Sequence, residues 1–479
     1  MATISSIGAG SGLPVEEIIA KLMSIERQPV VDLQTKATSL QAKLSSYGKL
    51  QSNISAVKDA ATKLNDPVTW GANLSTSSDA TSVTASTTQA SVAGTYAVSV
   101  SKLAAAQTIT GAAIPSDATT IGQGSITIEL GAWNADNTAF TPTAGKSAVT
   151  INIGAGEDSL TAARDKINAS GAGVVASVVS DAQGSRLVLR SANTGASNAF
   201  RVSATETAPG PNGGPGLSSL AYDPSNGITT AKVAQYAQSA VGKINGIDVV
   251  SESNTVSNVI DGLTVNFSKV TSADVSVTVG ADKEAIKKAI NDFATAYNAL
   301  ATFMKDQTKY TPKSGTTAAS SGPLQGDSTA ITMQSQLRTL ASSSSTLGGS
   351  LTRFADIGLD PQADGTLKVN AAKLDGALGN LPSLKKMLSG LDSADPNNNG
   401  ITQRMAALTT AALSFDGSLN SKQTGLRETI NRNGDDQDKI NMRLTLVEAR
   451  MRASYTALDK SMAKLTGLQS YVNQQFGVK

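Results

Sequence analysis

The chain has 479 residues and a formal net charge of +2, so the composition indicates neither a nucleic-acid partner nor an acidic tail. Cys and His are both absent, which excludes disulfides, thiolate and imidazole metal sites, and Ser–His–Asp catalysis. No membrane-length apolar stretch and no secretory signal pattern are present. We therefore expect about three soluble domains, no membrane insertion, and any export by a route that reads no cleavable signal.

The first predicted elements are helices. Small residues lead to a helix beginning near Pro14, a residue favoured in the first helical turn, with Ile18, Leu22 and Ile25 on one face. Pro29 interrupts this helix. A second apolar seam follows and is ended by Asp66-Pro67; its positions are Leu33, Ala37, Leu40, Leu44, Tyr47, Ile54, Val57, Ala61 and Leu64.

From about residue 75 the composition changes to Thr, Ser, Val and Gly, and the apolar period falls to two. This alternation predicts half-buried antiparallel strands, for example around Val98, Ile128, Val265 and Val277. One short helix is expected at 158–169, capped by Asp158 or Ser159.

Helical periodicity returns at 282–305 and near 327–342. A hairpin is expected between Phe354 and Val369, and further helices at 371–390 and 401–433. The layout is therefore helix, β, helix.

The last forty residues carry the longest apolar stripe. It advances by 3.6 residues per step, without proline, through Ile440, Leu444, Val447, Met451, Tyr455, Leu458, Met462, Leu465, Val472 and Phe476. A lone amphipathic helix of this length leaves its stripe in water, and packing supplies most helical stability. The pattern predicts an intertwined or oligomeric terminus.

If the terminal seams pair, both ends of the β region return to one place. The predicted fold class is a multidomain α+β protein, in which both termini form a long coiled-coil stalk that carries inserted antiparallel β domains. We assign 1–45 and 435–479 to the terminal coiled coil, 46–75 and 281–434 to a helical leg, 76–109 and 233–280 to an inner β domain, and 110–232 to an outer domain inserted in it. In this arrangement the strands near Val98, Val265 and Val277 share a sheet.

Motifs for small ligands are weak, and we expect no cofactor, metal or catalytic residue. The glycines Gly8, Gly10 and Gly12 follow no strand and lack the Gly-Lys-Ser/Thr ending of a phosphate loop, so a flexible tail is favoured. The acidic turns beginning at Asp360 and Asp395 lack the glutamate that a calcium loop has at its twelfth position. No carboxylate pair can be placed together from the sequence, which disfavours a hydrolase.

Both ends of the chain resemble the flagellar filament cap protein family, also called hook-associated protein 2. The N-terminal resemblance is carried by Gly10-Ser11-Gly12-Leu13 and Glu26-Arg27-Gln28-Pro29, and the C-terminal one by Tyr455-Thr456-Ala457-Leu458-Asp459 and Tyr471-Val472-Asn473-Gln474-Gln475-Phe476. Lys243-Ile244-Asn245-Gly246 and Asp364-Gly365-Thr366-Leu367 add internal matches, whereas 110–230 is unmatched. Pro14 stands where the family often has Asp.

The resemblance implies an extracellular homo-oligomer of four to six subunits at the distal filament tip, exported by the flagellar apparatus with a chaperone. Implied partners are flagellin, which folds and inserts beneath the cap, and the hook–filament junction proteins. The stripes at both termini would be the docking and oligomerisation seam. Alternatives are a junction protein or flagellin itself, or an adhesin whose β head binds host glycans; the scarcity of aromatic residues argues against the adhesin.

Overall fold

The computed structural model describes residues 14–210, 215–314 and 319–477, except for the side chain of Phe476. The predictions for Gly8, Gly10 and Gly12 lie outside these residues. The chain forms two units. The helical unit comprises the chain up to Trp70 and from Lys283 onward, and the β unit comprises Gly71–Asp282. The prediction of a multidomain α+β protein with a terminal helical stalk and inserted β domains is confirmed.

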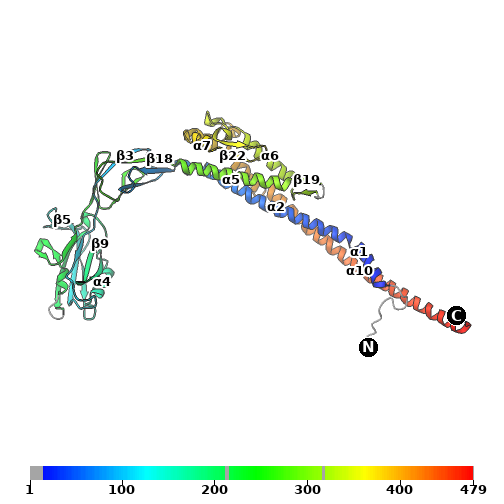
Figure 1. Ribbon diagram of the computed structural model, residues 1–479, viewed down its shortest axis with the longest axis horizontal. Coiled ribbons are helices and arrows are strands. Elements are labelled where there is room, and N and C mark those ends of the chain that lie inside the picture. Colours follow the sequence, from blue (N-terminus) through cyan, green and yellow to red (C-terminus); the bar gives the residue numbers. More distant parts are fainter. Residues whose placement is uncertain (1–13, 211–214, 315–318, 478–479) are drawn as a thin grey trace. The chain divides into compact units, whose positions relative to one another are not determined.

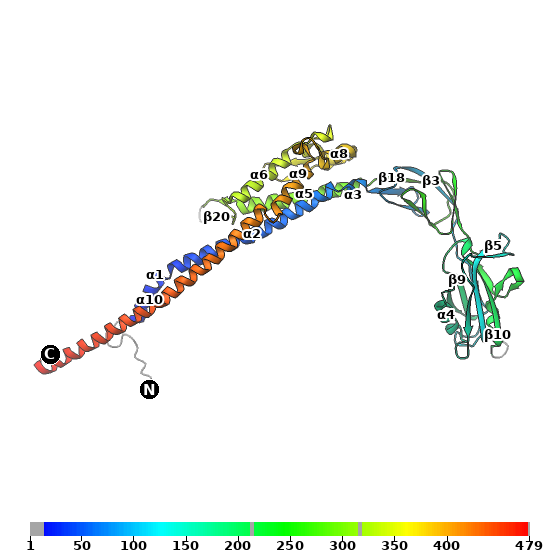
Figure 2. The ribbon, with the colours of Figure 1, turned by 180° about the vertical axis from the view of Figure 1, so that it is seen from behind.

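The helical unit begins with two helices separated at Arg27, two residues before Pro29, which occupies the first turn of the second helix. Its helices are α1 (Val15–Glu26), α2 (Gln28–Asn65), α3 (Pro67–Gly71), α5 (Lys283–Thr308), α6 (Ser328–Ser342), α7 (Ala371–Ala377), α8 (Leu381–Ser389), α9 (Ile401–Leu413) and α10 (Ser418–Phe476). Figures 1 and 2 show α1 and α2 running beside α10, so the two terminal segments pair within one chain.

Two expected helices are each divided in the structure. The helical pattern at 371–390 breaks before Asn380, whose side chain caps α8 by accepting from the Ser383 N–H. The pattern at 401–433 breaks between Leu413 and Ser418, where Gly417 precedes α10. Glycine and asparagine caps favour these breaks, although the apolar period continues through both of them.

The core of the helical unit lies where α2 packs against α5, α9 and α10. Tyr47, Phe293, Tyr297 and Phe354 are its largest fully buried side chains. The predicted hairpin is present as β21 (Leu359–Pro361) and β22 (Leu367–Val369), and the side chain of Asn298 on α5 bonds both backbone groups of Leu367. A further short pair, β19 (Tyr310–Thr311) with β20 (Ser320–Ser321), follows α5.

The inner part of the β unit contains a five-stranded and a three-stranded antiparallel sheet. In sheet order, the first is β1 (Asn73–Ser77), β18 (Val275–Ala281), β3 (Gly94–Lys102), β14 (Ala240–Ile244) and β15 (Ile247–Ser251). The second is β16 (Thr255–Ile260), β17 (Leu263–Phe267) and β2 (Val83–Thr87).

The expectation that Val98, Val265 and Val277 share one sheet was wrong for Val265. Val98 in β3 and Val277 in β18 lie in the five-stranded sheet, whereas Val265 in β17 pairs with Ala85 and Val256. All three strands have the same alternating pattern, so the pattern alone does not say which strands pair.

The outer part of the β unit forms between β3 and β14. Its six-stranded sheet contains β12 (Ile228–Thr229), β11 (Tyr222–Asp223), β10 (Ala199–Ala208), β5 (Gln123–Trp133), β6 (Phe140–Pro142) and β7 (Val149–Ile153). Its four-stranded sheet contains β13 (Lys232–Gln235), β4 (Thr108–Thr110), β9 (Gly184–Ser191) and β8 (Val174–Asp181). α4 (Leu160–Ala169) packs on this sheet and is capped by Ser159.

Several domain boundaries drawn from the sequence fall inside elements. The 45/46 and 434/435 boundaries lie within the continuous helices α2 and α10. The 109/110 and 232/233 boundaries cut β4 and β13, which pair with each other in the outer four-stranded sheet. The 75/76 boundary lies within β1, and the two units meet in sequence after Trp70 and Asp282 instead. Composition changes gradually along the chain, so it does not mark the ends of elements.

Candidate docking site of the terminal helices

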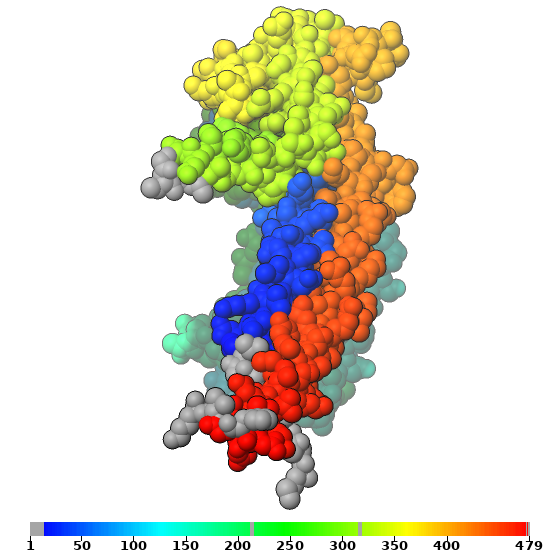
Figure 3. Space-filling model, turned by 90° about the vertical axis from the view of Figure 1, so that its right-hand side faces the viewer, coloured from blue at the N-terminus to red at the C-terminus, as the bar shows by residue number. Residues whose placement is uncertain are grey.

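An antiparallel contact between α1 and the middle of α10 joins the two ends of the chain. Val15, Ile19 and Met23 of α1 and Val30 of α2 are buried against Leu444 of α10. Ile440, Val447, Met451 and Tyr455 pack around this cluster and are half-buried. In Figure 3 the blue surface of α1 and α2 lies against the orange and red surface of α10.

Two ion pairs border this contact. Arg452 Nη1 lies 2.8 Å and 2.9 Å from the two carboxylate oxygens of Glu16, and Arg443 Nη2 lies 3.3 Å from Glu26. Hydrogen bonds to Glu16 and Glu448 raise the pKa of Arg452 above its ordinary value. Because these side chains are largely exposed, they stabilise the contact little but fix the antiparallel alignment.

The structure corrects the predicted face of the first helix. Leu22 is 37% exposed and Ile25 is 71% exposed, and Ile18 is half-buried, whereas Val15, Ile19 and Met23 face α10. The two stripes have nearly the same helical spacing, so periodicity does not distinguish them. α1 therefore keeps a second apolar face that has no partner among the described residues.

The predicted residues of α2 lie beside the start of the terminal seam. Leu33 and Ile440 line a groove of about 470 Å³ between α2 and α10, together with Pro29, Lys36 and Lys439. Leu40 and Leu44 are half-buried and pack against the core of the helical unit. The apolar seam along α2 is therefore partly buried by contacts within the chain.

Beyond Tyr455 the stripe of α10 has no partner among the described residues. Leu458 is 44% exposed, Met462 38%, Leu465 60% and Val472 43%. Phe476 is the last residue of α10, but its side chain is not among the parts that the structure describes. From Tyr455 the seam positions alternate three and four residues apart, with Gln469 as the polar member, and average 3.5 residues per step. That repeat is typical of a coiled-coil seam.

A buried polar cluster that the sequence did not reveal joins α2, α6 and α10. The Tyr47 hydroxyl donates to Asp327 at 2.5 Å, and Lys422 Nζ lies 3.1 Å from the other oxygen of that carboxylate. Asp327 also caps α6 by accepting from the Thr329 and Ala330 N–H groups. Burial alone would raise the pKa of Asp327, but the bonds from Tyr47, Lys422 and Ala330 together hold it below its ordinary value.

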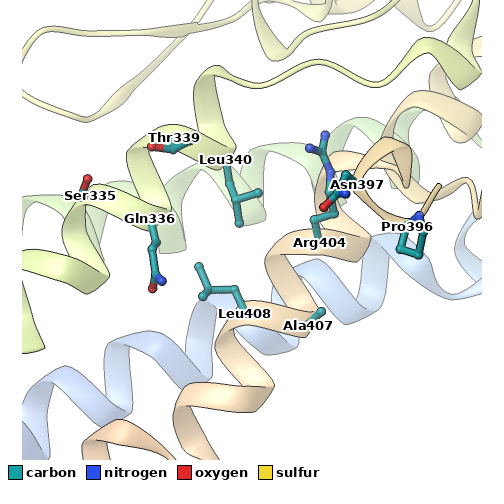
Figure 4. Close-up of a pocket in the computed structure, with 9 residues that line it drawn as sticks. All are labelled: Ser335, Gln336, Thr339, Leu340, Pro396, Asn397, Arg404, Ala407 and Leu408. Atoms are coloured by element: carbon teal, nitrogen blue, oxygen red, sulfur yellow. The ribbon is translucent and has the colours of Figure 1, made fainter.

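A groove of about 420 Å³ lies between α6 and α9, and it too was not predicted. In Figure 4, Leu340 of α6 and Leu408 of α9 point toward one another, and Arg404 lies beside Asn397. Arg404 donates to the Ser344 carbonyl at 2.8 Å, while its buried Nε has no hydrogen-bond partner in the described structure. No sequence signal marks this groove, because its walls are far apart in the chain.

The acidic turns serve as backbone caps. Asp364 accepts from the backbone and hydroxyl of Thr366, and Asp395 accepts from the Asn397 N–H. In the described part of the chain, no three acidic side chains gather as a metal site would require. Across the same residues, no helix is both long and apolar enough to cross a membrane.

Comparisons with known proteins cover nearly the whole chain. Residues 11–107 match the family model described as the N-terminus of flagellar hook-associated protein 2, and residues 237–467 match the model of its C-terminus. Residues 134–193 match the flagellin hook IN motif. Flagellar hook-associated protein 2 of Escherichia coli (strain K12) is 32% identical over 489 residues, covering 99% of this chain and 98% of that protein. The Salmonella typhimurium protein is 30% identical over 483 residues, covering 99% of each.

A solved structure agrees. The crystal structure of the D1–D2–D3 domains of the flagellar cap protein FliD from Escherichia coli matches with a TM-score of 0.58 and 30% sequence identity. The match covers 80% of this chain and 99% of that one.

The fold is that of a multidomain structural protein with a terminal helical stalk and inserted β domains. The chain belongs to the flagellar hook-associated protein 2 family, the flagellar cap proteins. It is therefore a component of the filament tip, outside the cell, with a role in filament assembly. No comparison supports the adhesin alternative.

Proposed function

We propose that this protein caps the filament as a homo-oligomer of four to six subunits, and that its terminal helices dock it to the filament end. Flagellin subunits fold and insert beneath its β unit, and the hook–filament junction proteins are further partners. The flagellar export apparatus and a chaperone deliver the chain. The protein acts by binding and positioning other chains and catalyses no reaction.

One observation carries this proposal. α10 extends for about 20 residues beyond its last contact with α1, and it exposes apolar side chains at coiled-coil spacing. Burying such a stripe needs further helices, and a coiled coil with other chains supplies them. The exposed face of α1, with Leu22 and Ile25, offers a second surface for the same purpose.

Charges placed in the distal stripe test the docking role. Leu458→Asp with Leu465→Asp puts two carboxylates into the seam, and one uncompensated buried charge costs several kcal/mol. The β unit is remote in sequence and should fold normally. We expect a secreted, folded protein that does not hold the filament tip, with unpolymerised flagellin in the medium and non-motile cells.

Lys460→Asp with Lys464→Asp is the matched control. Both lysines are exposed on α10 and lie off the seam, so the helix receives the same two carboxylates without burying them. Motility and flagellin retention should stay near normal. A Leu458/Leu465 double variant that still swims on full-length filaments would show that this stripe does not dock the cap.

A further inference from the structure

Phe415 is the most exposed large apolar side chain of the described residues, at 86%. It lies on the short connection between α9 and α10, and its position is fixed by the local backbone. The Gly417 N–H donates to the Ser414 carbonyl at 2.9 Å, and the Asn420 side chain donates to the Phe415 carbonyl at 2.7 Å. The structure thus presents an aromatic ring to solvent on a hydrogen-bonded turn, which is typical of a preformed anchor for a partner.

Asp416 follows Phe415 and is also exposed. It forms no ion pair in the described structure. The turn therefore offers an aromatic ring with a free carboxylate beside it, and we call these two residues the knob.

The groove between α6 and α9 has the complementary chemistry. Its apolar wall is formed by Leu340, Pro396, Ala407 and Leu408, and its volume of about 420 Å³ exceeds the roughly 150 Å³ of a cavity that holds benzene. Arg404 supplies a positive charge, and its Nη2 donates to the Ser344 carbonyl. Burial lowers the pKa of Arg404, although Asp395 acts in the opposite direction, so this guanidinium is poorly solvated.

We propose that the knob of one copy inserts into the α6/α9 groove of the next copy, with Phe415 against Leu340 and Leu408 and Asp416 beside Arg404. Every copy carries both halves of this contact on the same helical unit. Phe415 is 86% exposed, so its ring does not fill the groove of its own chain.

A knob and a separate groove make a heterologous contact, and repeated contacts of this kind form a ring when the rotation between neighbouring copies closes. The inference rests on the proposed cap oligomer and names a surface that joins its subunits. This surface is separate from the terminal seam, so the subunit contact proposed here and the filament docking proposed above can be refuted independently.

Disulfide cross-linking tests the contact directly, because the chain has no cysteine of its own. Ser414→Cys places a thiol next to the knob, and Gln336→Cys places one on the groove rim; both keep Phe415, Asp416 and Arg404. A mixture of the two full-length variants, oxidised at assembling concentration, should give a disulfide-linked dimer that neither variant gives alone. Pairing Ser414→Cys with Val68→Cys, at a 57% exposed residue of the same unit, should give none.

Assembly mass provides the second measurement. Phe415→Ala removes the knob, and Ala407→Trp fills the groove without removing a hydrogen bond. Light scattering should show that each substitution weakens self-association at least tenfold, while the thermal unfolding of both variants stays like that of the parent. The control Val68→Ala should not change self-association. Asp416→Lys should weaken it as well.

Three results would overturn the proposal. The first is that the mixture of Ser414→Cys and Gln336→Cys does not form a disulfide-linked dimer. The second is that Ser414→Cys links mainly to another copy of itself. The third is that the Ala407→Trp variant self-associates as strongly as the parent protein. If Phe415→Ala assembles normally but releases flagellin, the knob contacts flagellin instead. Cross-linking that persists in the Leu458/Leu465 double variant would separate this contact from filament docking.

Discussion

At the scale of single residues, Asp327 joins three helices that are far apart in sequence. It accepts from Tyr47 of α2, pairs with Lys422 of α10 and caps α6. The carboxylate is nearly fully buried, so its bonds are protected from water, and removing the Tyr47 donor leaves its oxygen with only the Thr329 and Ala330 N–H groups of the described residues. This cluster fixes the register of α2 and α10 where the core of the helical unit approaches the terminal seam.

Tyr47→Phe should destabilise the helical unit by about 1.5–3 kcal/mol, the usual contribution of a hydrogen bond to a charged group. The chain has two tryptophans, and Trp70 is buried in the core of the helical unit. Urea unfolding followed by Trp70 fluorescence in a Trp133→Phe background would measure the effect. Tyr310→Phe, at a 55% exposed tyrosine, is the matched control and should change little. Equal effects of the two changes would contradict the role of Asp327.

The same cluster should make stability depend on pH. The pKa of Asp327 is lowered in the folded state, so its contribution is complete above the ordinary value of about 4 and is lost as the pH falls through the lower folded value. The stability difference between the parent and Tyr47→Phe should therefore be constant from pH 5 to pH 7 and shrink below about pH 4. A difference that grows on acidification would refute this linkage.

At the scale of elements, the contact between α1 and α10 shows how little periodicity says about orientation. α1 has apolar residues on two faces, and the face with Val15, Ile19 and Met23 packs against α10. The side with Leu22 and Ile25 stays exposed in the single chain.

Ile19→Ala should open the α1–α10 contact in dilute protein, because truncating a buried isoleucine costs about 2–5 kcal/mol. Ile25→Ala, at a 71% exposed position of the same helix, should change local stability by no more than about 0.5 kcal/mol. Amide hydrogen exchange in α1 measures both. Faster exchange in Ile25→Ala than in Ile19→Ala would reverse the assignment of the two faces.

At the scale of the whole molecule, the outer β part is inserted between two strands of the inner part. The two segments that connect the inner and outer parts pair at the bridge between Ala105 and Gln238. The N–H group of each residue donates to the carbonyl of the other, at 2.8 Å and 3.1 Å. Glu252 of the inner part accepts bonds from Thr194 and Ser197 of the outer part. We infer that the natural boundary of the outer part is this bridge.

Removing residues 106–237 and joining Ala105 to Gln238 with a short glycine linker should leave the inner sheets folded. Their core, which includes Val98, Phe267 and Val277, is made within the inner part. Calorimetry should still show a cooperative transition for it. Removing 110–232 instead leaves parts of β4 and β13 without β9, and that variant should be less stable. Loss of the inner transition in the first variant would contradict the nested arrangement.

Local periodicity was sufficient for much of this protein. The 3.6-residue and two-residue repeats placed the helices and strands, and their order along the chain indicated a helical stalk with an inserted β region. The seam from Leu444 to Val472 was also readable, because a helix fixes which of its own residues share a face. Proline and capping residues located the start of α1, both ends of α2 and the start of α4.

The tertiary structure decided the contacts between distant segments. These contacts determine which face of α1 is buried and place Val265 in a different sheet from Val98. They also bring Tyr47, Asp327 and Lys422 together. The groove around Arg404 likewise exists only because α6 packs beside α9. Periodicity describes one element at a time, whereas these features depend on which elements pack together and in which register. That choice is set by the packing of the whole core, so it could not be read from any one stretch of the chain.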